Sequence, residues 1–342
     1  ALGSGLATDP YMFSFFRFLG GVGVGASTVA APTYISEIST ANSRGRLVAL
    51  YQFNIVFGIL VAFISNYLFD GFSGSNDWRW MLGIEAVPAA LYCMLILGVP
   101  NSPRWLLVER GDKEGALQTL QLLHSNVQTA QAELKAIVAH QSQEESGGNV
   151  FSGKYNKSLI LAFLLAFFNQ LSGINFILYY APVILENAGF ASSDSLLSSI
   201  SIGGTNLVFT IVGVYLIDRV GRKSLMYLGS VGYIVSLAMV AYGFKTEASA
   251  GFNLFFILMF IASHAVGQGA VIWVFIAEIF PNSVRAAGQA WGTGTHWVFA
   301  ALITMLGEVV IEAFPGWIVF AFFAGFMILQ LLFTHFMMPE TK

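Results

Sequence analysis

The chain has 342 residues, of which 56% are hydrophobic, 15% aromatic and only 10% charged, whereas a soluble domain has about 25% charged residues. Its formal net charge of −3 gives no reason to expect a nucleic-acid partner. The single cysteine, Cys93, excludes an internal disulfide framework and a cysteine-based metal site. The composition therefore indicates an integral membrane protein.

Apolar stretches of about 20 residues, each long enough to cross a bilayer as a helix, recur along the chain. The sequence predicts nine such spans, at 11–36, 48–69, 79–99, 158–181, 195–217, 224–244, 251–279, 288–312 and 316–338. We therefore predict an all-α membrane protein in three parts. These are a helix bundle at 1–100, a soluble helical linker at 101–157 and a six-helix bundle at 158–342.

The predicted linker is amphipathic and is polar enough to lie in water. Asp112 can cap a helix over about 113–124. The apolar face of that helix consists of Ala116, Leu117, Leu120 and Leu123. A second short helix is predicted over 128–139, followed by a flexible loop over 141–149.

The fourth predicted span carries many hydrogen-bonding side chains. Its polar residues are Asn169, Gln170, Ser172, Asn175, Tyr179 and Tyr180. An unsatisfied polar group is costly in hydrocarbon, so these groups must pair with neighbouring helices or with a ligand. Gly173 and Pro182 allow the helix to break and to turn Gln170 and Asn175 toward one cavity. This pattern predicts a polar binding site within the membrane.

Lysine and arginine are distributed unevenly between the two sides of the predicted spans. Of the 16 lysines and arginines, only Arg79 and Lys245 lie on one side, and Arg17 lies within a span. Positively charged loops stay in the cytoplasm, so the linker and the C-terminus are predicted to be cytoplasmic. The short loops on the other side favour a bacterial inner membrane.

Two parts of the chain repeat the same charged motif. Glu37 and Arg44 are seven residues apart, and Glu278 and Arg285 repeat this spacing in the second half. Parallel repeats of this kind are typical of one large class of transporters. The repeat offset places the start of the first half about 80 residues before Ala1. The sequence thus predicts a fragment that lacks about the first three spans of a twelve-span protein.

Several longer motifs stand in order at the ends of the predicted spans. They are Tyr34-Ile35-Ser36-Glu37 with Arg44-Gly45-Arg46, Pro100-Asn101-Ser102-Pro103-Arg104-Trp105-Leu106, Asn169-Gln170-Leu171-Ser172-Gly173-Ile174-Asn175, Asp218-Arg219-Val220-Gly221-Arg222-Lys223, Glu278-Ile279-Phe280-Pro281 with Arg285, and Pro339-Glu340-Thr341. Through these motifs the chain resembles, over nearly its full length, the sugar porters of the major facilitator superfamily. The resemblance implies the major facilitator fold, with nine of twelve transmembrane helices present, and transport by alternating access. Departures from the family pattern at Asn101, Asn169 and Ala270 leave the identity of the sugar open.

The resemblance also implies which side chains line a central cavity. These are Gln52, Asn169, Gln170, Asn175, Asn206, Trp273 and Trp297, and His296 occupies a position where relatives place another amide. Amides suit sugar hydroxyls because each offers a donor and an acceptor, and tryptophan suits the apolar C–H face. No acidic or basic residue joins this set, which favours a neutral sugar or polyol. The alternative is interhelical hydrogen bonding by the amides and interfacial anchoring by the tryptophans.

A second group, of charged residues, is assigned to gating. By the resemblance, salt bridges at cytoplasmic helix ends hold the two bundles together and involve Glu37, Arg44, Glu85, Arg104, Asp218, Arg219, Arg222, Glu278 and Arg285. Such ion pairs are individually modest, so they can break and form again during transport. Positive-inside topology with acidic counter-ions is the alternative, although it leaves the repeated Glu–Arg spacing unexplained.

Arg17 is assigned to proton coupling. An unpaired arginine in the middle of a span costs about 2.5–3.5 kcal/mol, so a partner is expected. In proton-coupled relatives the equivalent arginine faces an aspartate on the first span, and the resemblance implies the same here. Passive relatives keep this arginine too, so symport and facilitated diffusion both stay open.

The sequence contains no phosphate-binding loop, which disfavours ATP-driven transport, and its five histidines have no metal-binding spacing. No cofactor or metal is therefore expected. We predict a monomeric secondary active transporter in the lipid bilayer, with a neutral monosaccharide or related polyol as substrate, the proton as co-substrate and no nucleic-acid partner. The alternatives are a passive sugar facilitator, a non-transporting sugar sensor and an integral membrane enzyme.

Overall fold

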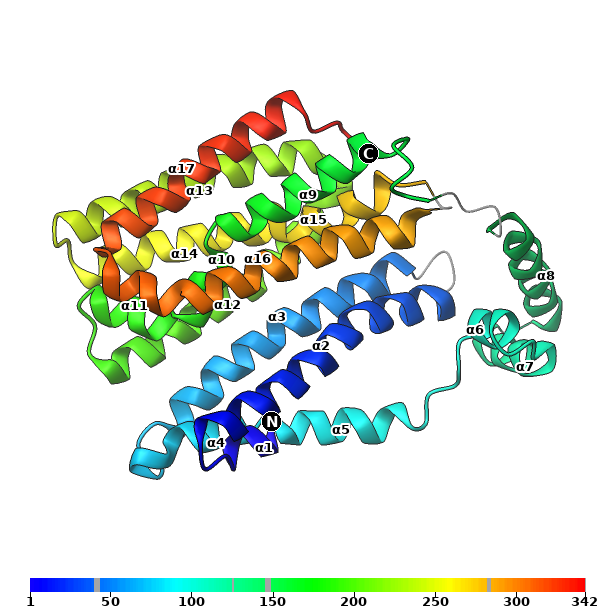
Figure 1. The fold of residues 1–342 in the computed structure, drawn as a ribbon, viewed down its shortest axis with the longest axis horizontal. Helices are drawn as coiled ribbons and strands as arrows, with labels where there is room; N and C mark the ends of the chain where they lie inside the picture. The colour runs from blue at the N-terminus through cyan, green and yellow to red at the C-terminus, as the bar shows by residue number, and fades with distance from the viewer. Residues whose placement is uncertain (40–43, 125, 145–148, 282–283, 342) are drawn as a thin grey trace. The chain divides into compact units, whose positions relative to one another are not determined.

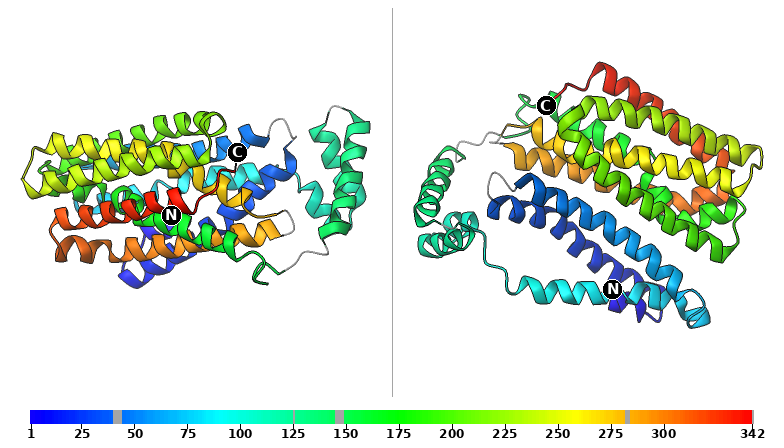
Figure 2. Two further views of the ribbon diagram at one scale, coloured as in Figure 1. Left: turned by 90° about the horizontal axis from the view of Figure 1, so that it is seen from above. Right: turned by 180° about the vertical axis from the view of Figure 1, so that it is seen from behind.

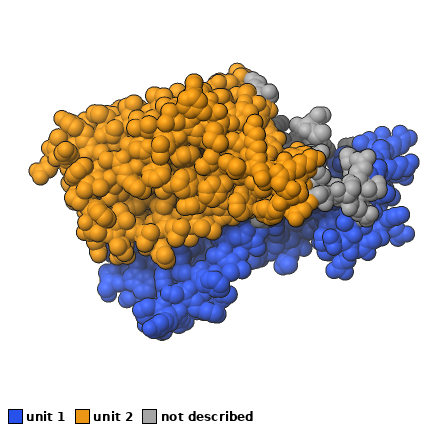
Figure 3. Space-filling model, turned by 45° about the horizontal axis from the view of Figure 1, so that its top comes forward, with its two compact units in different colours: residues 1–55, 65–147 blue, residues 56–64, 148–342 orange. Residues whose placement is uncertain are grey.

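The computed structural model describes residues 1–39, 44–124, 126–144, 149–281 and 284–341. All regular secondary structure in these ranges is helical (Figure 1, Figure 2). Within them, nine helical stretches are long and apolar enough to cross a membrane, and each corresponds to one predicted span. The described chain divides into two compact units (Figure 3). Unit 1 comprises residues 1–55 and 65–147, and unit 2 comprises residues 56–64 and 148–342.

Unit 1 contains three apolar segments followed by three shorter linker helices. Its elements are α1 (Leu2–Gly5), α2 (Pro10–Ile38), α3 (Arg44–Phe69, except for its residues 56–64), the 3-10 helix η1 (Gly74–Asn76), α4 (Asp77–Gly83), α5 (Ala86–Ile96), α6 (Pro103–Val108), α7 (Lys113–Leu123) and α8 (Val127–Glu144). Asp9 caps α2 by accepting two backbone N–H hydrogen bonds, which fixes the start of this helix. Arg79 on α4 donates to the carbonyls of Gly5 at 3.0 Å and Ala7 at 2.5 Å, and so ties the third span to the first residues of the chain.

Helices α6, α7 and α8 pack on one another in the segment that the sequence predicts to be a soluble linker. The prediction for α7 is confirmed, because Asp112 caps this helix and Ala116 and Leu120 are buried. The predicted end of α8 is wrong, because the helix continues to Glu144 through residues assigned to a flexible loop. Glutamine and glutamate are good helix formers, and they extend the helix. Residues 145–148 of that loop lie outside the described residues, and the three-part domain division stays a prediction.

Unit 2 is a helix bundle that buries two hydrophobic clusters. Its helices are α9 (Asn156–Leu171), α10 (Ile174–Tyr179), α11 (Ala181–Asn187), α12 (Ser192–Val220), α13 (Arg222–Lys245), α14 (Ala250–Val266), α15 (Gln268–Glu278), α16 (Arg285–Ala313) and α17 (Gly316–Phe336). Helix α13 packs against α14 and α17, α9 against α16, and α12 against α14. One cluster includes Tyr233 and Phe260, and the other includes Leu165 and Phe275. This packing also encloses polar side chains of α9, α13, α15 and α17.

Two spans of unit 2 are interrupted at a glycine. Gly173 separates α9 from α10 and has φ +84°, a conformation that glycine adopts at low cost, so the predicted break is confirmed. The seventh span is predicted to be continuous, but it breaks at Gly267, between α14 and α15. A Cβ on Gly267 would lie 2.7 Å from the Cα of Gly229 on α13. The break between α14 and α15 therefore lies too close to α13 for any residue larger than glycine at position 267.

Candidate functional site

Gln170, near the end of α9, is the centre of a group of amides. Its Oε1 accepts a hydrogen bond from Asn175 Nδ2 at 2.9 Å, and its Nε2 donates to Asn169 Oδ1 at 3.0 Å. The same Nε2 lies 3.1 Å from Nδ1 of His296 on α16. In an unbroken helix, side chains five residues apart point roughly 140° away from each other, so the break at Gly173 lets Asn175 reach Gln170. The structure thus brings together four of the predicted substrate-binding residues.

Further amides, which sequence reasoning missed, continue this group into the interior of unit 2. Gln268, the first residue of α15, accepts from Asn169 Nδ2 at 3.3 Å and donates to Gln330 Oε1 at 2.7 Å. Gln330 Nε2 donates in turn to Ser230 Oγ at 2.9 Å. The signal that marks Gln268 and Gln330 in the sequence is an amide inside an otherwise apolar span.

Tyr233 on α13 also hydrogen-bonds to the group of amides. Its hydroxyl lies 2.6 Å from Nδ1 of His264 and donates to Gln268 Oε1 at 3.4 Å. Among the described residues, none of the buried polar atoms of this group lacks a hydrogen-bond partner. This pairing is what burial in an apolar environment requires.

The accessible side of the group is formed by Asn175, His296 and two tryptophans. Asn169 and Gln170 are 2% and 0% exposed, whereas Trp273 and Trp297 are 36% and 40% exposed. The His296 ring packs edge-on against Trp273 and Trp297, with ring centroids 5.0 Å and 5.3 Å apart. A polar edge beside exposed indole rings can bind hydroxyls on one side of a ligand and C–H groups on another.

Two predicted substrate-binding residues stand apart from these side chains. Asn206 is buried on α12, and no hydrogen bond between described residues joins it to the amides. Gln52 is half-buried on α3 and belongs to unit 1. Their place in the site stays a prediction. A cavity of about 340 Å³ elsewhere in unit 2, lined mainly by hydrophobic residues such as Phe176 and Phe320, contains none of the predicted site residues.

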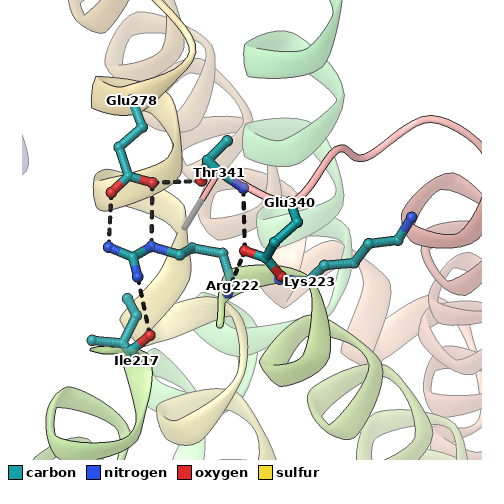
Figure 4. A network of polar contacts seen from close by, with 6 residues as sticks. All are labelled: Ile217, Arg222, Lys223, Glu278, Glu340 and Thr341. Atoms are coloured by element: carbon teal, nitrogen blue, oxygen red, sulfur yellow. Dashed lines mark hydrogen bonds and ion pairs between the residues drawn. The ribbon is translucent and has the colours of Figure 1, made fainter. Parts of the chain in front are cut away.

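Arg222, the first residue of α13, is the centre of an ion cluster at one end of unit 2 (Figure 4). Its guanidinium donates to both carboxylate oxygens of Glu278, at 2.8 Å and 3.2 Å, and to the carbonyl of Ile217 at 3.1 Å. Glu340 accepts from the backbone amides of Arg222 and Lys223 at 3.0 Å and 3.1 Å. A carboxylate at the positive end of a helix dipole is favourable, so Glu340 caps α13.

Among the described residues, Glu278 forms its ion pair with Arg222, and not with Arg285, which stands seven residues later in the repeated motif. Arg285 instead donates to the carbonyl of Phe280 at 3.4 Å. The physical reason is that Glu278 ends α15 and Arg285 begins the next helix, α16, whereas Arg222 lies on a helix that packs against α15. Glu340 was missed as a member of the cluster, although it lies in the terminal Pro339-Glu340-Thr341 motif.

The other residues predicted for gating lie in different surroundings. Glu37 accepts a hydrogen bond from the hydroxyl of Ser102, which also caps α6. Arg219 lies over a tyrosine ring, with 4.0 Å from its Cζ to the ring centroid, and Arg104 is exposed on α6. The side chains of Arg44 and Asp218 lie outside the described residues. The gating role of these residues stays a prediction.

Glu85 does not lie at a cytoplasmic helix end, contrary to the prediction. It lies within the span Gly74–Ile96, at the break between α4 and α5. Its Oε2 is 4.0 Å from Nη1 of Arg17, and the two side chains are 53% and 51% exposed. An arginine within a span requires a counter-charge, and Glu85 supplies one. Arg17 therefore has an acidic partner inside unit 1, whereas the sequence predicts its partner on an additional span.

Comparisons with known proteins agree with one another. A family model described as "Sugar (and other) transporter" matches residues 1–342. The D-xylose-proton symporter of Escherichia coli (strain K12) is 33% identical over 346 residues, which cover 96% of this chain and 69% of the relative. The arabinose-proton symporter of Bacillus subtilis (strain 168) is 33% identical over 355 residues, which cover 100% of this chain and 75% of the relative. A solved structure of the proton:xylose symporter of the major facilitator superfamily, bound to 6-bromo-6-deoxy-D-glucose, matches with a TM-score of 0.79 and 31% identity, over 97% of this chain and 72% of that one.

Proposed function

This chain belongs to the sugar transporter family within the major facilitator superfamily, and from that premise we propose that it carries a monosaccharide or a related polyol by alternating access, in symport with protons. It is a multi-pass membrane transporter and not an enzyme. Because similar proteins are named for symport of D-xylose and of arabinose with protons, a pentose is the first substrate to test.

The observation that carries the proposal is the accessible group of Asn175, His296, Trp273 and Trp297. An asparagine offers both a donor and an acceptor to sugar hydroxyls. When one ring nitrogen of His296 accepts from Gln170, the other carries the proton and can donate to a further hydroxyl. The exposed tryptophans offer ring surface to the C–H groups of the sugar. No Asp, Glu, Lys or Arg belongs to this group, which fits a neutral ligand.

Proton coupling is assigned to the pair of Arg17 and Glu85. Both residues lie within spans of unit 1, where charge is costly unless it is compensated. Uptake of a proton by Glu85 removes its attraction for Arg17, and loss of the proton restores it. Protonation and the positions of α2 and α5 are therefore linked, which is one requirement of symport.

The cluster of Arg222, Glu278 and Glu340 is assigned to a gate. It joins α13, α15 and the segment after α17, so movement of α15 away from α13 must break two charge-assisted hydrogen bonds. The excess of basic residues on this side and in the linker supports a cytoplasmic location for both. We take the protein to be a monomer in a bacterial inner membrane.

Uptake of labelled D-xylose into proteoliposomes tests the proposal. With a pH gradient that drives protons inward, we expect accumulation above the external concentration, and a protonophore should abolish it. Equilibration at equal concentrations under every gradient would identify a passive facilitator, and binding without uptake would identify a sensor.

Glu85→Gln tests the coupling residue separately. Glutamine cannot take up the proton, so this variant should equilibrate D-xylose without accumulating it. Glu186→Gln, which changes an exposed carboxylate on α11, is the matched control and should accumulate sugar normally. Normal accumulation by Glu85→Gln would remove Glu85 from the coupling mechanism and would leave the transport function unaffected.

A further inference from the structure

Gln268 links the two broken spans of unit 2 at their breaks. It is 0% exposed and is the first residue after the break at Gly267. Its Oε1 accepts from Asn169, which lies on α9 just before the break at Gly173. Its Nε2 donates to Gln330 at 2.7 Å, the shortest hydrogen bond among the amides described above. Gln268 is therefore held by both Gln330 and the hydroxyl of Tyr233, and it in turn holds Asn169.

The hydrogen bonds through these amides all run in one direction. Asn175 donates to Gln170, Gln170 to Asn169 and Asn169 to Gln268. Gln268 then donates to Gln330, and Gln330 donates to the hydroxyl of Ser230. A primary amide has its donors on nitrogen and its acceptor on oxygen, so turning one member by 180° would set donor against donor at one side and acceptor against acceptor at the other. The orientation of each amide is thus fixed by its neighbours.

We infer that Gln268 is a positioning residue for substrate selectivity, an inference that rests on the proposed sugar-binding role of Asn175 and His296. Asn169 and Gln170 are 2% and 0% exposed, so they present almost no surface to a ligand in this structure. Their effect on a sugar passes through Asn175, which donates to Gln170 Oε1, and through His296, whose ring lies against Gln170 Nε2. By anchoring Asn169, Gln268 determines which donors and acceptors Asn175 and His296 turn toward the substrate.

Interhelical adhesion is the competing explanation, because buried amides also join helices in membranes. If Gln268 only joins helices, its loss lowers the stability of the bundle and weakens the binding of every sugar by the same factor. If Gln268 positions the binding groups, its loss affects sugars differently, because sugars that differ only in the direction of one hydroxyl require different donors and acceptors at that point. The ratio of affinities for two epimers therefore separates the two explanations, whereas the affinity for one sugar does not.

The test compares Gln268→Met with Gln330→Met in the purified protein. Both substitutions replace a fully buried glutamine with an apolar side chain of similar length, but only the first removes the acceptor of Asn169. In Gln330→Met the Oε1 of Gln268 still accepts from Asn169 and from the hydroxyl of Tyr233. Dissociation constants are measured for D-xylose, its C2 epimer D-lyxose and its C3 epimer D-ribose. We expect the affinity ratio of D-xylose to at least one epimer to change by about fivefold in Gln268→Met and by less than twofold in Gln330→Met, with similar losses of thermal stability.

An unchanged ratio in Gln268→Met, or an equal change in both variants, would overturn the inference. Where Gln268→Met does not fold, Gln268→Asn replaces it, because this variant keeps a neutral amide but withdraws it from Asn169 by one methylene group. The same shift in ratio is expected, and a parental ratio in Gln268→Asn would overturn the inference too. Asn175→Ala separates this failure from failure of the site itself. Unchanged affinity for all three sugars in Asn175→Ala would overturn both the proposed site and the role of Gln268.

Discussion

Replacing Arg222 and Glu278, singly and together, measures how strongly α13 is tied to α15. Two charge-assisted hydrogen bonds, at 2.8 Å and 3.2 Å, join the guanidinium to the carboxylate. Each bond of this type contributes about 1.5–3 kcal/mol, but the Glu278 side chain is 29% exposed, and water screens it. We therefore expect a coupling energy of about 2 kcal/mol between Arg222→Met and Glu278→Met. Methionine is used at both positions because it forms no substitute hydrogen bond of comparable strength.

The two single substitutions should differ in their effect on stability. Glu278→Met removes the carboxylate that accepts two hydrogen bonds from a guanidinium that is only 10% exposed, which is expected to cost about 3 kcal/mol. Arg222→Met leaves a carboxylate that water can reach and that still accepts from Thr341. Its expected cost is smaller, about 1–2 kcal/mol.

The assay is the free energy of unfolding of the purified protein in detergent, measured for the parent, both single variants and the double variant. A second cycle that pairs Glu278→Met with Arg285→Met is the control, and its effects should add to within about 0.5 kcal/mol. A coupling energy below about 0.5 kcal/mol for Arg222 and Glu278, or a larger one for Arg285 and Glu278, would refute the pairing.

Transport measurements on the same variants test the gating role proposed for the cluster of Arg222, Glu278 and Glu340. Arg222→Met should lower the maximum rate of D-xylose uptake while leaving the equilibrium affinity much less affected, because the cluster shares no residue with the amides around Gln170. Loss of affinity together with a normal rate at saturation would assign the cluster to substrate binding.

Two further predictions concern the site and its scaffold. Alanine at Asn175 should weaken D-xylose binding by at least about 1 kcal/mol, because sugar hydroxyls and Gln170 lose their hydrogen bonds. Alanine at Gln170 should have an effect of the same size, because Asn175 and His296 lose the partner that orients them. Unchanged affinity in both variants would place the binding site elsewhere. Gly173→Ala should destabilise the protein by about 1–2 kcal/mol, since φ is +84° and a Cβ would lie 2.7 Å from the ring of Phe323. The same change at Gly251, where nothing lies within 4 Å, should be neutral or stabilising in thermal unfolding, and equal losses at the two glycines would contradict the argument.

Local features of the sequence were sufficient to predict the membrane spans and one of the two helix breaks. The length and hydropathy of the apolar stretches predict the nine spans because a bilayer accepts only segments that satisfy their own backbone hydrogen bonds. The break at Gly173 was predictable because Gln170 and Asn175 need polar partners, and a glycine lies between them. The cap of α7 by Asp112 depends on residues within one helical turn and was predictable for the same reason.

Three other features depend on contacts between segments that are distant in the sequence. The break at Gly267 follows from close approach to Gly229, and nothing local distinguishes Gly267 among the chain's 35 glycines. The roles of Gln268 and Gln330 follow from the way α15 and α17 pack beside α9 and α13. A sequence pattern shows that an amide is buried in a span, but it does not show which amide on another helix it meets.

The ion pairs show most clearly that the sequence does not specify which distant residues meet. The repeated Glu–Arg spacing marks Glu278 as a residue that needs a cation, yet its partner is Arg222. Likewise, Arg17 requires an acidic partner by its position in a span, and only the tertiary structure places Glu85 beside it. The sequence determines that a charge within a span must be compensated, because leaving it unpaired in a low-dielectric environment is costly. Which charge compensates it depends on how the helices rotate and pack, and that is decided by contacts along their whole length.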